Sequence, residues 1–122
     1  MQKKFIRTIM CCALAASSLM SVECMASTEE GIAAYYSNVF QGRKTASGQR
    51  YDKHKLTAAH KTLALGTQVR VINLKNNQSV VVTINDRGPH SKKRIIDLSL
   101  AAAKRLDLVK AGVGSVRLET LN

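Results

Sequence analysis

The sequence contains no tryptophan, one proline and three cysteines. Because Cys11, Cys12 and Cys24 all precede residue 25, the rest of the chain can form neither a disulfide nor a cysteine-ligated metal site. Three tyrosines and two phenylalanines are too few to supply the interleaved aromatic side chains on which nucleic-acid bases stack. We therefore expect a domain held together by its apolar core, with no metal, no cofactor and no nucleic-acid partner.

Acidic side chains are also scarce, with eight against 19 lysines and arginines, so the formal net charge is +11. Removal of the first 26 residues, which carry three basic and one acidic side chain, would still leave +9. A small domain this basic favours a polyanionic partner. Cell-wall polymers and an anionic envelope surface meet this requirement outside the cytoplasm.

The first 26 residues have the pattern of a secretory signal peptide, with a basic start, an apolar stretch over residues 9–20 and a cleavage point after Ala26. The apolar stretch is shorter than the roughly 20 residues that span a bilayer. Lipid attachment at Cys24 is the alternative, which Glu23 disfavours because such sites take a small residue there. We expect residues 27–122 to form one soluble, periplasmic, monomeric domain without a lipid anchor.

Short apolar runs separated by glycine, serine and asparagine favour a compact, mainly β domain. The strands are expected at residues 31–36, 56–60, 67–74, 79–84, 94–98 and 116–119. A polar surface loop is expected at residues 42–52. The alanine-rich residues 99–106, which begin with the N-cap residue Ser99, are expected to form one short helix.

Residues 85–89 (Asn-Asp-Arg-Gly-Pro) directly follow a run of β-branched residues and include the single proline. A buried strand therefore delivers the Asp86 carboxylate into a tight turn, which is how a rigid scaffold presents an acid to a groove. The local alternative is that Asp86 only caps the turn, since aspartate favours such positions.

Six segments extend this motif over nearly the whole expected domain: residues 31–36, 45–48, 56–60, 66–74, 82–89 and 94–99. Together and in this order they resemble the rare lipoprotein A (RlpA) family of double-psi β-barrels. The resemblance implies a mainly β fold, a six-stranded double-psi β-barrel with one short α-helix. It also implies an endolytic peptidoglycan transglycosylase that acts on glycan strands stripped of stem peptides, in cell-wall remodelling and daughter-cell separation.

The resemblance implies that Asp86 is the catalytic residue. In lytic cleavage a carboxyl group protonates the glycosidic oxygen, and its conjugate base then helps the muramyl C6 hydroxyl to attack C1. The product is a 1,6-anhydro end, and no water is consumed. One acid/base group can therefore serve both steps, whereas an ordinary glycosidase usually needs two carboxyl groups.

The resemblance also gives a catalytic role to His60, which could orient a carboxylate or hydrogen-bond the sugar. The alternative is a partly buried histidine whose ring nitrogens are satisfied within the fold. His60 and Asp86 each end an apolar stretch, so we expect them to meet at one mouth of the barrel. Gln49 is expected to approach the same groove from its loop.

Tyr36, Ser47, Gln49 and Arg87 are the expected substrate-binding residues. Gln49 stands where many relatives carry glutamate, and an amide can hydrogen-bond a sugar but cannot transfer a proton. A non-catalytic wall-binding module similar to expansins is therefore the alternative function. Arg87 is expected to point away from Asp86, because a close ion pair would hold the carboxyl group ionised and unable to act as an acid.

Three further polar residues are assigned to structural roles. His54 and His90 fall outside the family's motifs and are expected on the surface. Asp97 is expected to support the turn into the helix rather than the chemistry.

The first prediction concerns processing. Protein exported to the periplasm should begin at Ser27, because the small residues before it fit signal peptidase. N-terminal sequencing of the exported protein checks this. A mature terminus at a diacylated Cys24, seen by mass spectrometry, would show that the protein is lipid-anchored instead.

Overall fold

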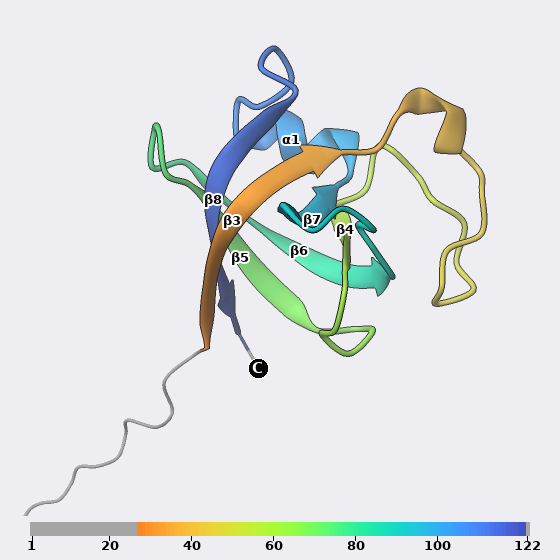
Figure 1. Cartoon of the computed structure of the whole chain (residues 1–122). Coiled ribbons are helices and arrows are strands. Elements are labelled where there is room, and N and C mark those ends of the chain that lie inside the picture. The colour runs from red at the N-terminus through yellow and green to blue at the C-terminus, as the bar shows by residue number, and fades with distance from the viewer. Residues whose placement is uncertain (1–26, 122) are drawn as a thin grey trace, which may run out of the picture.

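The fold is described by a computed structural model that places residues 27–121; the expected signal peptide and its cleavage point lie outside these residues. Within them, six strands close into a barrel in the order β3-β7-β4-β6-β5-β8 (Figure 1). The strands are β3 (Thr28–Tyr35), β4 (Thr57–His60), β5 (Gln68–Asn73), β6 (Ser79–Asp86), β7 (Arg94–Leu98) and β8 (Val113–Thr120). The 3₁₀ helix η2 (Asn38–Phe40) and the helix α1 (Leu100–Arg105) complete the fold. The mainly β, six-stranded barrel with one short α-helix is therefore confirmed.

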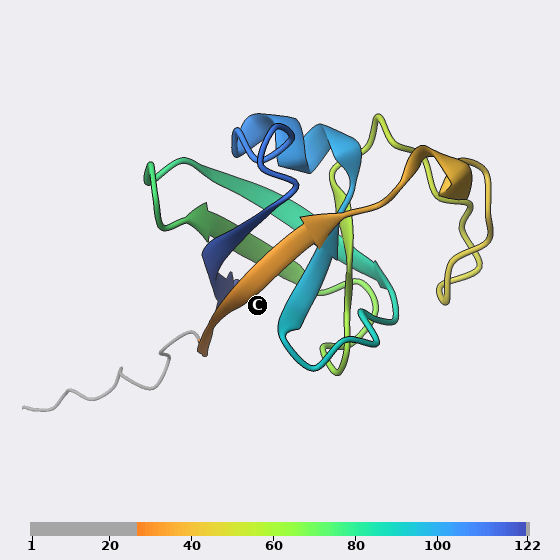
Figure 2. The ribbon, with the colours of Figure 1, turned by 45° about the horizontal axis from the view of Figure 1, so that its top comes forward.

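Two strand pairs are parallel, β3 with β7 and β4 with β6, and the other four pairs around the barrel are antiparallel. Parallel neighbours cannot be joined by a hairpin and need long crossover connections. The connection from β3 to β4, which are separated by β7 in the barrel, contains η2 and the expected polar loop. It projects from the body of the barrel (Figure 2), and a bridge between Lys44 and Arg50 braces it.

The barrel interior is filled by alternate residues of each strand, as the two-residue period of a β-strand requires. On β6, for example, Val80, Val82 and Ile84 are buried. Their counterparts on the other strands are Val69, Val71, Ile96, Leu98, Val116 and Leu118. The side chains between them therefore face outward, where a binding site can form.

Helix α1 lies across one end of the barrel (Figure 2). Its N-cap is Ser99, whose side chain accepts a hydrogen bond from the Ala102 backbone N–H. Ala102 and Ala103 are buried on the barrel side, and Leu106 follows the helix as its C-cap. The helix expected at residues 99–106 is thus confirmed, with its two end residues serving as caps.

Strands β3 and β8 are longer than expected, because they pair antiparallel from Thr28 opposite Glu119 to Ala34 opposite Val113. The polar residues at the start of β3 are exposed. This stretch is held by ladder hydrogen bonds and by an exposed ion pair, Arg117 Nε to Glu30 Oε2 at 3.2 Å. Because it contributes no apolar residues to the core, an alternating apolar pattern in the sequence does not reveal it.

The second prediction tests the helix cap. Ser99 is buried, and its Oγ accepts hydrogen bonds from the backbone N–H groups of Ala102 (3.2 Å) and Thr57 (3.4 Å). Ser99→Ala leaves both donors unsatisfied and should lower the free energy of unfolding by about 1–2 kcal/mol. Urea denaturation measures this change. Ser79→Ala, at the exposed start of β6, is the matched control and should change stability by less than about 0.5 kcal/mol.

Candidate active site

Three segments of the chain converge on the carboxylate of Asp86, the last residue of β6. The phenolic O–H of Tyr36, just after β3, donates to Oδ2 at 2.5 Å. The backbone N–H of Ala46, in the long loop, donates to Oδ1 at 2.8 Å. The backbone N–H of Arg87 donates to the same oxygen at 2.9 Å. Three donors from three segments fix the orientation of one carboxylate, which is far more than capping a turn requires.

Asp86 lines a cavity of about 490 Å³ on the outer face of the barrel. Tyr35, Tyr36 and Phe40 supply aromatic surface, Asp86 and Asp97 supply two carboxyl groups, and Arg87, His90 and Arg94 supply basic groups. Cavities of this size hold small ligands or a few sugar units. Aromatic rings with charged and hydrogen-bonding groups around them suit a polar polymer such as a glycan.

Tyr36 is held as a hydrogen-bond donor in this cavity. Burial of its phenol, with the hydrogen bond to Asp86 as the second cause, raises the pKa of Tyr36 well above its usual value. Its ring packs against Tyr51, with centroids 4.4 Å apart, and against Phe40 at 5.6 Å. The phenol is therefore rigidly placed and remains protonated.

Asp97 belongs to this cavity, although the sequence assigned it only a supporting role. Ala59 on β4 pairs with Asp86 of β6 on one side and with Asp97 of β7 on the other. The two carboxyl groups thus flank one small side chain. Desolvation by burial raises the pKa of Asp97, the negative charge of Asp86 adds to this, and Arg94, 3.2 Å away, opposes it.

One signal for Asp97 was present in the sequence. Ile96 and Leu98 are core residues, so the alternation of β7 places Asp97 on the outer face. What the sequence does not show is that β4 lies between β6 and β7, and this pairing brings the second carboxyl group to the first.

The expected meeting of His60 with Asp86 is not what the structure shows. Both ring nitrogens of His60 have other partners: Nε2 contacts Glu29 Oε1 at 2.9 Å, and Nδ1 accepts from the N–H groups of Thr62 and Leu63, both at 3.1 Å. The ring lines a separate cavity that includes Glu29. Successive strand residues point to opposite faces, so Ala59 faces the Asp86 cavity and His60 faces away from it. The alternative, a buried histidine with a satisfied ring, describes its position.

Gln49 and Ser47 shape the loop that reaches Asp86. The Gln49 carbonyl accepts from the Thr45 backbone N–H (2.8 Å), and the Ser47 N–H donates to the Asn85 carbonyl (3.0 Å). Gln49 lines an adjoining cavity of about 800 Å³, together with Asn85, and is not among the residues that line the cavity of Asp86. These residues therefore place the Ala46 N–H against Asp86.

Arg87 points away from the Asp86 carboxylate, as expected: its Nη1 donates to the His60 carbonyl at 2.8 Å. His54 and His90 are exposed, also as expected, although His90 lies on the rim of the cavity. Within residues 27–121, no group of three or more histidine, aspartate and glutamate side chains is placed to hold a metal ion.

The third prediction follows from the raised pKa of Asp97, whose ordinary value is 3.8. At lower pH this carboxyl group is neutral in both folded and unfolded protein, so it carries no charge penalty. As the pH rises through the raised folded pKa, a half-buried group must ionise, and its contribution to stability is lost. The stability of wild type relative to Asp97→Asn should therefore fall between pH 3 and pH 7. Urea denaturation at both values checks this, and a rise with pH would contradict the assignment.

Comparison with known proteins places this chain in a family. The sequence profile of the lytic transglycolase family matches residues 28–118. The chain is 55% identical over 94 residues to the endolytic peptidoglycan transglycosylase RlpA of Haemophilus influenzae, covering 77% of this chain and 33% of that protein. It is 46% identical over 101 residues to the protein of the same name from Campylobacter jejuni, covering 83% of this chain and 37% of that protein. The chain thus spans about a third of the length of these curated relatives.

Solved structures agree on the fold. The Streptomyces papain inhibitor superposes with a TM-score of 0.65 at 22% identity, covering 80% of this chain and 97% of the inhibitor. An expansin from Clavibacter michiganensis gives 0.63 at 24% identity, covering 79% of this chain and 51% of the expansin. At these identities the likeness concerns the barrel alone. The sequence match over residues 28–118 shows more: this chain is a double-psi β-barrel that belongs to the lytic transglycolase family.

Proposed function

We propose that this domain cleaves the glycan strands of peptidoglycan without hydrolysis, leaving 1,6-anhydromuramyl ends, and that Asp86 transfers the proton. The observation that carries the proposal is the Asp86 carboxylate, held by three donors in a cavity of glycan size. The curated relatives are named as endolytic peptidoglycan transglycosylases, which supports the same reaction.

The reaction needs one group that both gives and takes a proton. A carboxylic acid protonates the glycosidic oxygen, and the bond from C1 to that oxygen breaks. The muramyl C6 hydroxyl then bonds to C1 and gives its proton to the carboxylate, which restores the acid. The Tyr36 hydroxyl and the Ala46 N–H hold the carboxylate in one orientation through both steps. Preorganised donors of this kind require little rearrangement during reaction.

A second carboxyl group is available even though residue 49 is a glutamine. Asp97 lines the same cavity as Asp86, and burial raises its pKa. It can therefore hold a proton more readily than an exposed aspartate, which is what supply of a proton to the site requires. Gln49 can contribute hydrogen bonds to a strand in the adjoining cavity.

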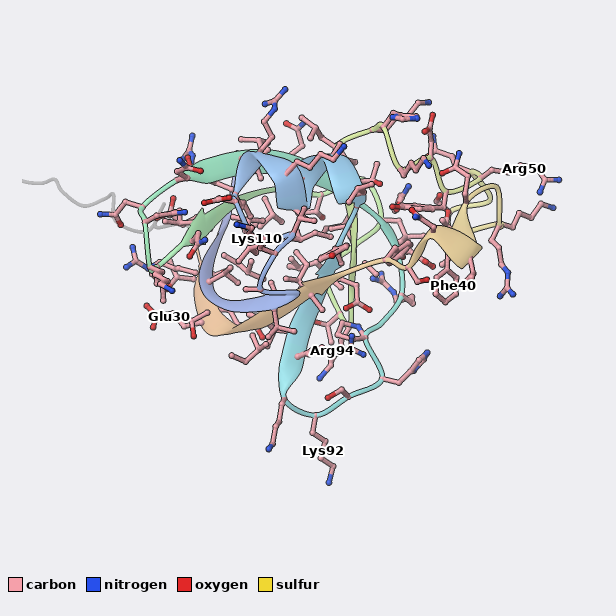
Figure 3. All side chains as sticks on the ribbon, turned by 90° about the horizontal axis from the view of Figure 1, so that it is seen from above. Glu30, Phe40, Arg50, Lys92, Arg94 and Lys110 are labelled. Atoms are coloured by element: carbon pink, nitrogen blue, oxygen red, sulfur yellow. The ribbon has the colours of Figure 1, made fainter. Side chains whose placement is uncertain are left out.

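The charge around the cavity suits glycan strands that lack stem peptides. Removal of the peptide leaves a free carboxylate on each lactyl group of muramic acid. Arg87, His90 and Arg94 line the cavity, and Lys92 projects outward from the loop before β7 (Figure 3). These basic groups would attract the free carboxylates. The exposed ring of Phe40 would offer a surface to the sugar beside them.

The cellular role follows the same proposal. We place the protein in the periplasm as an exported monomer that acts in cell-wall remodelling and daughter-cell separation. Its positive charge would also allow contact with anionic envelope surfaces. In the described part of the chain, no helix is long and apolar enough to cross a membrane.

The fourth prediction tests the catalytic residue. Asp86→Asn keeps the shape of the side chain but removes its proton transfer. Release of anhydromuramyl ends from purified strands lacking stem peptides should fall by about 10²–10⁴-fold. Mass spectrometry of the products measures this. Asp107→Asn is the matched control: Asp107 is exposed, and asparagine tolerates its positive φ of 59°.

Two outcomes would change the assignment. Undiminished product from Asp86→Asn would exclude Asp86 as the proton-transfer residue. If wild-type protein binds the strands but releases no anhydro ends, the expansin-like binding function would replace the lytic one. Gln49 in place of glutamate is the feature that favours this second function.

A further inference from the structure

The hydrogen bonds around His60 assign one protonation state to its ring. The ring is buried, and Nδ1 lies 3.1 Å from two backbone donors, the N–H groups of Thr62 and Leu63. Nδ1 must therefore accept and carries no proton. The ring proton lies on Nε2, which donates to Glu29 Oε1 at 2.9 Å. With both nitrogens engaged, the ring is an anchored structural group rather than a proton donor to substrate.

The backbone of the same residue holds Arg87. The His60 carbonyl accepts from Arg87 Nη1 at 2.8 Å, and the backbone N–H of Arg87 donates to Asp86 Oδ1 at 2.9 Å. Contacts thus run from Glu29 through His60 and Arg87 to the carboxylate without a gap.

Glu29 lies on the part of β3 that does not pair with β7. In the barrel order, β7 lies between β3 and β4. The pairing of β3 with β7 begins at Ile32 opposite Arg94, so it does not extend to Glu29. There the hydrogen bond between Glu29 and His60 connects the start of β3 directly to the end of β4.

We propose that Glu29 is a positioning residue for Asp86. It fixes His60, and the His60 carbonyl in turn keeps the Arg87 guanidinium away from the neighbouring carboxylate. Without this anchor, the guanidinium could turn to Asp86 and form an ion pair that holds the carboxyl group ionised and unable to act as an acid. The inference rests on the proposed function and gives His60 an indirect role in it.

The fifth prediction compares three variants. Glu29→Ala removes the acceptor for Nε2–H and should lower turnover of glycan strands by roughly tenfold, because small displacements of a catalytic group are costly. Glu29→Gln keeps an acceptor oxygen at the same reach and should restore most of the turnover. Glu30→Ala, the matched control, removes the adjacent side chain, which pairs with Arg117 instead, and should leave turnover unchanged. Strand binding, measured separately, should be equal in all three.

An NMR measurement tests the positioning independently of turnover. The Ala46 amide donates to Asp86 Oδ1, so its resonance reports the position of the carboxylate. It should shift in Glu29→Ala and remain in place in Glu30→Ala. Nitrogen-15 spectra of the His60 ring should show an unprotonated Nδ1 and a protonated Nε2 in wild type.

The outcomes separate the two proposals. If wild type releases anhydro ends, either of two results overturns the positioning role. One is full turnover in Glu29→Ala, and the other is a loss of turnover in Glu29→Gln as large as that in Glu29→Ala. If wild type releases none, the proposed function fails, and an unshifted Ala46 amide in Glu29→Ala overturns the positioning role separately. Should Glu29→Ala not fold, Glu29→Asp, which shortens the side chain by one methylene, replaces it under the same criteria.

Discussion

The position of β4 between β6 and β7 is the constraint on which the site depends. The small residue Ala59 pairs with Asp86 on one side and with Asp97 on the other, so two carboxyl groups face one cavity. The same alternation turns the next residue, His60, to the opposite face. A single pairing register thus decides which polar residues line the cavity and which lie on the opposite face of the strand.

The long connection between β3 and β4 supplies contacts to Asp86 that the strands themselves do not make. Strands β3 and β4 are not neighbours, since β7 lies between them in the barrel, and the long connection between them brings the Ala46 N–H to the carboxylate. Its end at β3 supplies the Tyr36 hydroxyl. Because the loop is anchored to Asn85, the residue before Asp86, loop and strand are held together at the Asp86 carboxylate.

The barrel alone does not define the chemistry. A papain inhibitor and an expansin have closely similar barrels, so the fold accommodates proteins of different kinds. The chemistry depends on the set of side chains on the outer face: two carboxyl groups, a half-buried tyrosine and several basic groups. The function is therefore argued from these groups and from the sequence match to the family.

The sequence by itself was sufficient for the fold class, the helix with its Ser99 cap, the core strands and the place of Asp86 at the end of a strand. These depend on local patterns, namely alternation, capping and a motif carried over from a family. It also predicted that Arg87 turns away from Asp86, which the structure confirms. The place of Asp97 in the cavity, the partnership of His60 with Glu29 and the position of Gln49 in an adjoining cavity were decided only by the tertiary structure. Each depends on contacts between segments distant in sequence, and strand order and register are set by packing of the whole barrel, which no local pattern contains.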